Sequence, residues 1–295
     1  MDSKGAIYYT DLEQVWKIER NGKKHIVVPR VHTHELYMDS RDNLFGEHLW
    51  YNGESVNTWG HYVWRLSNSG ILDTIKGPDE GFLEDYSFVR DSTGNMYWVE
   101  RSAISRFKKK APDGTITTIA EGRFENVRWM YSTPQGVLYF FDLTNLYKIE
   151  PRGRVTLVAK EIREKRAAFA GVGKNHMVFG IWTDKAGDIY VANFGGQVVK
   201  RVHSNGVIEN VAYSKTPWAP TGGLFDDEGN LWLLEASLTN EVRVRKVPSS
   251  EIGKKKEATA VVSNYLLPGL GALVIIVLCI FVVRWIRSRA RTQVV

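Results

Sequence analysis

The residues best suited to chemistry in this chain are His32, His34 and Glu35, which stand within four consecutive positions. In an extended strand, side chains two positions apart share a face, so the two imidazoles would lie together and Glu35 would point the other way. Two imidazoles form part of a zinc ligand set. His32 and His34 are therefore candidate metal ligands, and the alternative is that they are ordinary polar side chains at the mouth of a channel.

Other chemical motifs lack essential residues. The stretch 171–175 resembles the end of a phosphate-binding loop, but Ala168 and Asn175 stand where that motif needs Gly and Ser or Thr. The chain contains no Gly-x-Ser-x-Gly nucleophile motif and no Cys-x-x-Cys pair, and its one cysteine is Cys279. No catalytic residue is assigned from motifs.

The net charge of +6 is concentrated around one apolar segment near the C-terminal end. Seven basic residues flank that segment: Lys254, Lys255, Lys256, Arg284, Arg287, Arg289 and Arg291. Without these seven, 32 Lys and Arg stand against 33 Asp and Glu. The surplus indicates the ends of a membrane segment, so we expect no nucleic-acid partner.

A short sequence motif recurs six times and marks the elements on which any functional residue must lie. The fullest copies are Asp91–Trp98, Asp184–Val191 and Asp226–Leu233, and weaker copies are Ser3–Tyr8, Asp39–Phe45 and Thr133–Tyr139. Aligned on their glycine position, the copies are 37 to 52 residues apart. A period of this length with strand-forming residues in each unit is typical of propeller blades. The sequence predicts an all-β fold, a six-bladed β-propeller.

A second pattern occurs in the same phase. Alternating apolar and basic residues precede a glycine turn, as in Trp64–Leu66 before Gly70 and Tyr147–Ile149 before Gly153. Alternation of period two predicts a strand with one buried face, and glycine supplies the positive φ that a hairpin turn requires. Each blade should therefore have four antiparallel strands, with the innermost strand missing from the first blade and the outermost from the last.

The stretch Pro220–Trp232 resembles the unit that joins the first two strands of a blade in NHL-repeat propellers and in the gluconolactonase and luciferin-regenerating-enzyme family. The resemblance covers roughly residues 1–247 and depends on the sequence pattern of the repeats. It implies a ring of six blades with an axial channel.

The resemblance also implies where a ligand would bind. Gluconolactonase-like propellers hold one divalent metal with residues five positions before the Asp of each copy of the motif. Here those positions are His34, Tyr86, Arg128, Phe179 and Thr221, which we expect, together with Glu35, to line the mouth of the channel. Since only His34 is a metal ligand and Arg128 would repel a cation, no cofactor is expected, and a divalent metal is the open alternative.

A membrane span is predicted at Tyr265–Val283, which has no charge across 19 residues and would reach roughly 28 Å as a helix. The predicted organisation is a propeller over 1–248, a polar linker over 249–264, a single transmembrane helix over 265–285 and a short basic tail over 286–295.

The arginines after the span favour a cytoplasmic tail with the propeller outside the cytoplasm. Because no signal peptide is visible at the first residue, the alternative is a tail-anchored protein with a cytosolic propeller. A stretch upstream, or 258–263, would supply the missing strands.

These observations predict a membrane-anchored propeller that presents a binding face to a small molecule or a protein, with the lipid bilayer as its other partner. The alternative is a lactonase or ester hydrolase with a divergent axial site. Aromatic residues such as Trp50, Trp59, Trp182 and Trp218 are candidate contacts.

Overall fold

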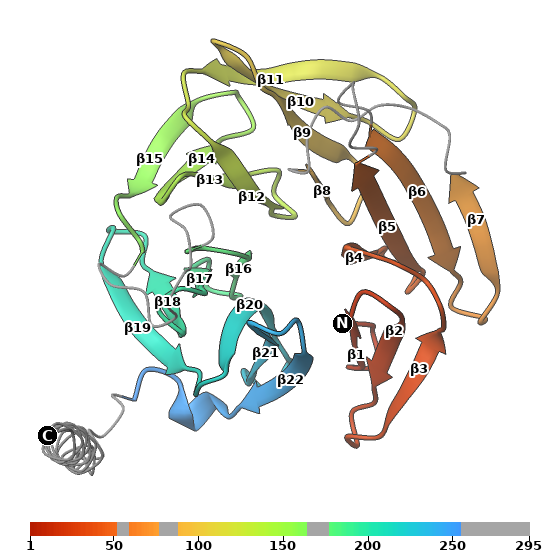
Figure 1. Cartoon of the computed structure of the whole chain (residues 1–295). Coiled ribbons are helices and arrows are strands. Elements are labelled where there is room, and N and C mark those ends of the chain that lie inside the picture. Colours follow the sequence, from red (N-terminus) through yellow and green to blue (C-terminus); the bar gives the residue numbers. More distant parts are fainter. Residues whose placement is uncertain (52–58, 77–87, 164–176, 255–295) are drawn as a thin grey trace, which may run out of the picture. The chain divides into compact units, whose positions relative to one another are not determined.

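The computed structural model describes residues 1–51, 59–76, 88–163 and 177–254. These belong to one compact unit, Met1–Lys254, in which six antiparallel sheets are arranged as a ring (Figure 1). The prediction of an all-β, six-bladed propeller is confirmed. The predicted span Tyr265–Val283 lies outside the described residues, and within them no helix is long and apolar enough to cross a membrane.

The sheets follow one another along the chain as blades 1 to 6, and each blade is built from sequential hairpins. Blade 1 contains β1 (Ile7–Thr10), β2 (Val15–Ile18) and β3 (Lys24–Val28). Blade 2 contains β4 (Glu35–Met38), β5 (Leu44–Tyr51), β6 (Trp59–Leu66) and β7 (Leu72–Lys76). Blade 3 contains β8 (Phe88–Arg90), β9 (Met96–Glu100), β10 (Ser105–Lys110) and β11 (Ile116–Gly122).

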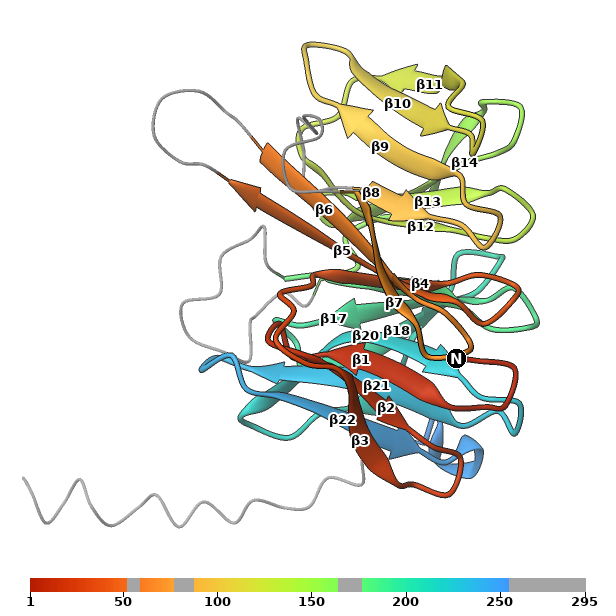
Figure 2. The ribbon, with the colours of Figure 1, turned by 90° about the vertical axis from the view of Figure 1, so that its right-hand side faces the viewer.

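The second half of the ring repeats this order. Figure 2 shows the ring from the side. Blade 4 contains β12 (Val127–Ser132), β13 (Leu138–Asp142), β14 (Asn145–Ile149) and β15 (Val155–Ala159). Blade 5 contains β16 (Ile181–Thr183), β17 (Ile189–Asn193), β18 (Val198–Val202) and β19 (Ile208–Tyr213). Blade 6 contains β20 (Trp218–Phe225), β21 (Leu231–Ser237) and β22 (Val242–Val247), and the 3-10 turn Ser249–Glu251 follows it.

The first and last described sheets have three strands each, as the repeat predicts. Strand β20 has eight residues and is the longest innermost strand among the described residues. The reason is that β20 continues to pair with β21 through a bulge after Pro220, from Gly222 opposite Leu234 back to Trp218 opposite Ser237.

The recurring motif forms the turn between the first two strands of a blade. Asp91 accepts hydrogen bonds from the backbone N–H groups of Thr93 (2.9 Å) and Asn95 (3.0 Å), and Gly94 provides the positive φ of 86°. Asp226 forms the same bonds in blade 6. Burial acts to raise the pKa of Asp226, but hydrogen bonds from Trp232 and Asn230 outweigh it and lower that pKa to about 2.

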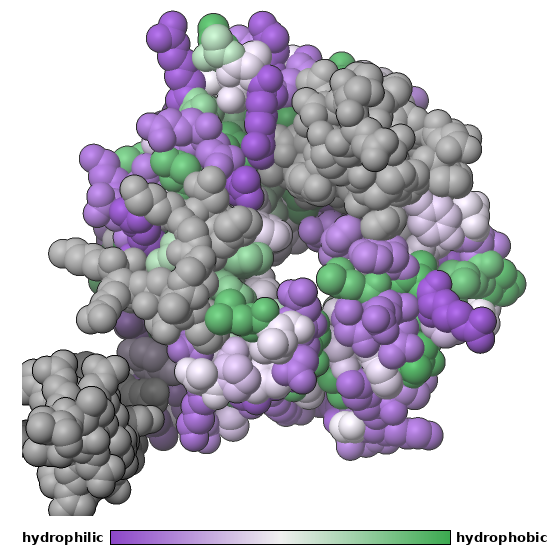
Figure 3. Space-filling view, in the orientation of Figure 1, coloured by the Kyte–Doolittle hydropathy of each residue, from purple (hydrophilic) through white to green (hydrophobic). Residues whose placement is uncertain are grey.

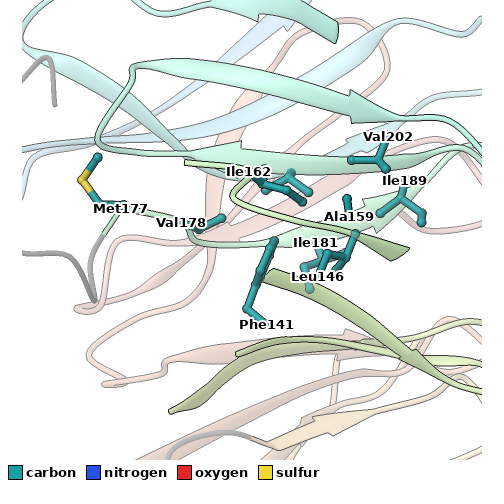
Figure 4. Packing of buried hydrophobic residues seen from close by; sticks show 10 residues of the cluster. Phe141, Leu146, Ala159, Ile162, Met177, Val178, Ile181, Ile189 and Val202 are labelled. Atoms are coloured by element: carbon teal, nitrogen blue, oxygen red, sulfur yellow. The ribbon is translucent and has the colours of Figure 1, made fainter. Parts of the chain in front are cut away.

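Buried apolar clusters join most neighbouring blades. Figure 4 shows the cluster between blades 4 and 5, where Phe141 and Leu146 pack against Ile181 and Ile189. Further clusters join blades 1 and 2, blades 3 and 4, and blades 5 and 6. Among the described residues, an ion pair between the Arg90 guanidinium and the fully buried carboxylate of Glu47 joins blades 2 and 3.

The boundary between blades 6 and 1, here called the seam, lacks a buried cluster among the described residues. An exposed ion pair between Arg20 and Glu228, 2.9 Å long, bridges it. Exposed pairs contribute about 0 to 1 kcal/mol. The seam is therefore a weakly joined part of the ring.

Candidate functional site

A cavity of about 710 Å³ follows the axis of the ring. Its wall is formed by β1 and by the innermost strands β4, β8, β12, β16 and β20, with contributions from β21 and β22. The space-filling view shows the central opening (Figure 3). Because the innermost strands of five blades run side by side around the axis, residues distant in sequence meet in this wall.

The structure brings together five of the six residues predicted at the channel mouth. His34, Glu35, Arg128, Phe179 and Thr221 all line the axial cavity. The sixth, Tyr86, lies outside the described residues. The positions inferred from the resemblance therefore meet around one space, while their role in binding stays a prediction.

The two histidines lie close together but before the strand that the sequence placed them on. β4 begins at Glu35, and the ring centroids of His32 and His34 are 5.0 Å apart. Between them, the buried Thr33 accepts a hydrogen bond from the Trp64 indole (2.9 Å), which fixes the segment. Burial, and then the neighbouring His32, lowers the pKa of His34, so its imidazole is neutral at pH 7.

The axial positions do not fit the metal that the resemblance implies. Within the described part of the chain, no three His, Cys, Asp or Glu side chains gather as a metal-binding group. At the four expected ligand positions that the structure describes, the side chains are an imidazole, a guanidinium, a phenyl ring and a hydroxyl. A hard cation prefers several oxygen ligands, usually carboxylates, and the Arg128 guanidinium would repel it.

Glu35 is the acidic group of the cavity wall near His34. The Glu35 side chain is exposed to the water of the axial cavity. Partial desolvation by the cavity wall raises the pKa of Glu35 to about 7. Glu35 therefore exchanges a proton near neutral pH, where an ordinary glutamate is fully ionised.

Two arginines converge on one amide oxygen at the wall of the cavity. Arg101 donates to Asn126 Oδ1 at 3.3 Å, and Arg128 donates to the same oxygen at 3.2 Å. The Asn126 backbone N–H is held in turn by Asp142 Oδ1, 2.7 Å away. Within the described part of the chain, Arg128 makes no ion pair. Arg101 also donates to the Val127 carbonyl oxygen, so its guanidinium is held against β12.

An aromatic surface adjoins the two arginines. The ring of Trp129 lies 4.7 Å from that of Phe179, and both residues line the cavity. Trp129 is the bulged residue of β12, where the pairing shifts between Arg128 and Met130, and its φ is +48°. Its buried indole N–H has no hydrogen-bond partner among the described residues. A non-glycine residue in this backbone region costs free energy and is often found at functional sites.

The sequence analysis did not find Arg101 and Trp129 as site residues. Arg101 follows the end of β9 and belongs to no position that the repeat marks, so nothing in the pattern points it toward the axis. Trp129 stands one position after a predicted site residue and would face away from the axis in a regular strand. The bulge in β12 changes that direction, and the sequence carries no pattern for the bulge.

No family model matches the chain, and the curated proteins give no match either. Solved structures do resemble it. A gluconolactonase from Xanthomonas campestris has a TM-score of 0.56 and 13% sequence identity, over 83% of this chain and 83% of that one. A luciferin-regenerating enzyme has a TM-score of 0.55 and 11% identity, over 85% and 90%.

An auxiliary nutrient binding protein from Bacteroides thetaiotaomicron has a TM-score of 0.56 and 12% identity, over 82% of this chain and 66% of that one. The predicted resemblance is thus confirmed at the level of fold. The structure is a six-bladed propeller whose neighbours include gluconolactonase and the luciferin-regenerating enzyme. At these identities, the likeness extends to the fold alone.

Proposed function

We propose that the protein is a β-propeller binding module that takes a small organic carboxylate in its axial cavity. The observation that carries the proposal is the convergence of Arg101 and Arg128 on the Asn126 side-chain oxygen at the cavity wall. A carboxylate is a stronger acceptor for guanidinium groups than an amide, since both partners are charged.

The rest of the cavity supports this ligand class. Its volume of about 710 Å³ lies within the usual range for small-molecule sites. Trp129 and Phe179 provide an aromatic wall, and the orphaned indole N–H of Trp129 is a further donor. Because Glu35 stands in the same wall, a monoanion fits better than a phosphate dianion. The Bacteroides neighbour, an auxiliary nutrient binding protein, supports a binding role for this fold.

The test is the binding of carboxylates to the full chain in lipid nanodiscs, with the corresponding primary amides and inorganic phosphate as comparison ligands. Arg128→Gln should weaken carboxylate binding about 10- to 100-fold, since one charge-assisted hydrogen-bonding group is lost. The matched control is Arg106→Gln, because Arg106 pairs with Glu121 on β10 and β11 and does not line the cavity. Equal affinity for carboxylates and amides would refute the proposal.

A lactonase or ester hydrolase is the second candidate, and Glu35 is the observation that favours it. A carboxyl group with a pKa of about 7 is suited to act as a general base at neutral pH. If the protein hydrolyses a lactone or an ester, Glu35→Gln should lower turnover at least about 100-fold, as measured against a panel of both substrate types. Turnover that survives this change would remove Glu35 from the mechanism.

We also propose that Tyr265–Val283 anchors the propeller in a bilayer, with the propeller outside the cytoplasm and residues 286–295 inside. The uncharged stretch and the arginines that follow it support this arrangement. Alkaline extraction of membranes should leave the full chain in the pellet. Protease added to intact cells should then digest the propeller, whereas protection of the propeller would favour the tail-anchored alternative.

A further inference from the structure

The axial cavity continues from the axis into the seam between blades 6 and 1. On the side of blade 1, its wall is formed by Ile7, Tyr9 and Leu12, and on the side of blade 6 by Leu234, Val242 and Val244. The two guanidinium groups and this apolar slot thus belong to one continuous space.

The strand register explains why the slot is apolar. β22 alternates, and Arg243 and Arg245 face the side where both bind the buried Glu235 carboxylate, at 2.7 and 2.9 Å. Val242 and Val244 therefore face the other side, where they pair with Ala236 and Leu234 of β21. In blade 5, the side chains on the face toward the next blade are buried in a cluster with blade 6, in which Tyr190 packs with Leu231 and Leu233.

The equivalent residues of blade 6 are left partly exposed. Val242, Val244 and Leu234 are each partly accessible, and Leu12 across the seam is 38% exposed. Binding of an apolar group against these side chains is favourable, because it removes apolar surface of both partners from water. At the end of the slot near Trp232, Lys246 lies over the indole ring, 5.2 Å from its centroid. The apolar slot thus has a polar boundary at that end.

We propose that the ligand is an amphipathic carboxylate whose unbranched apolar chain lies in the seam while its head group binds Arg101 and Arg128. This inference rests on the proposed function, because the head group needs the arginine site. It adds that affinity depends on chain length, and that the residues of the seam set this dependence. Each fully buried methylene group raises affinity about fourfold.

The test compares butyrate with octanoate, with octanol as the ligand that lacks the carboxylate. Calorimetric titrations use the full chain in lipid nanodiscs, and titrations of empty nanodiscs are subtracted because the longer chains partition into lipid. Octanoate should bind at least about tenfold more tightly than butyrate. In the variant Leu234→Thr/Val244→Thr, this ratio should fall to about twofold while the butyrate affinity stays unchanged. Val207→Thr, in the exposed turn before β19, is the matched control.

Each outcome separates the two proposals. If the protein binds butyrate and octanoate equally, the seam does not hold a chain, whereas the carboxylate site stands. A chain-length dependence that survives the Leu234→Thr/Val244→Thr variant also overturns the inference, since the chain then lies elsewhere. If neither carboxylate binds, the proposed function fails and this inference fails with it. Octanol binding as tightly as octanoate would show that the arginines do not take part.

Discussion

Glu35 stands at the start of β4, where its side chain is exposed in the wall of the axial cavity. Its pKa of about 7 places the change of charge in the range where a cell operates. His34, beside it in the wall, has a pKa that burial lowers. Near pH 7, ionisation of the Glu35 carboxyl group therefore adds a negative charge to this part of the cavity.

Carboxylate binding should weaken as pH rises through about 7. Below this pH, Glu35 is protonated and neutral, and above it the ionised group repels an anionic ligand in the same cavity. We expect a decrease of about tenfold in butyrate affinity between pH 5.5 and 8.5. Titration calorimetry across this range measures it.

The matched variant for this experiment is Glu35→Gln, which keeps the size of the side chain and removes the titration. Its butyrate affinity should be nearly independent of pH and close to that of the wild type at low pH. If the wild type and Glu35→Gln lose affinity to the same extent, another group controls the charge of the cavity.

At the scale of the element, Gly46 of β5 leaves the space that the indole ring of Trp64 on β6 occupies. A Cβ atom placed on Gly46 of β5 would lie 2.0 Å from the indole of Trp64 on β6. Trp64 is 1% exposed and donates its N–H to Thr33, in the segment that carries His32 and His34. The glycine therefore positions the approach to the cavity as well as the core.

Gly46→Ala should lower the free energy of unfolding by about 3 kcal/mol, because the Trp64 ring has to move out of a packed core. Chemical denaturation of the full chain in nanodiscs, followed by near-ultraviolet circular dichroism, gives this value. Gly222→Ala is the control, since a Cβ atom there meets nothing within 4 Å and should change the free energy of unfolding by less than about 1 kcal/mol. Equal losses in both variants would contradict this explanation.

The elements also show which features the sequence could predict. In the three full copies of the motif, the Asp side chain and the Gly form a turn that depends only on nearby residues. Asp91–Trp98, Asp184–Val191 and Asp226–Leu233 therefore mark strand ends correctly. The bulge at Trp129 and the convergence of Arg101 with Arg128 depend on contacts between distant segments. No local pattern encodes those contacts. The sequence therefore predicted which repeat positions line the cavity, but it did not predict the aromatic and cationic residues added by Trp129 and Arg101.

At the scale of the whole molecule, the ring is held by different kinds of junction. In the described part of the chain, apolar clusters join four pairs of neighbouring blades, and a buried ion pair joins blades 2 and 3. The seam has the exposed Arg20–Glu228 pair and the apolar slot. The periodicity of the sequence predicts six blades, of which the first and the last are incomplete. The contacts between blades 6 and 1 depend on the closure of the ring, so the periodicity does not predict them.

Backbone amides in β1 and β22 should exchange hydrogen faster than those in β13 and β17, because local opening begins where the fewest buried contacts are lost. Native-state hydrogen exchange of the full chain, read by mass spectrometry, measures the difference. We expect about tenfold or more at the paired amides of these strands. Uniform protection across all four strands would show that the seam is as firmly joined as the other boundaries.

The weak junction at the seam has a practical consequence. A molecule that lies between blades 6 and 1 would contact both blades and so stabilise the boundary that has the fewest buried contacts among the described residues. Such a ligand raises the free energy of unfolding of the ring in proportion to the logarithm of its concentration. The melting temperature thereby becomes a readout with which candidate ligands can be ranked before any of them has been identified by its chemistry.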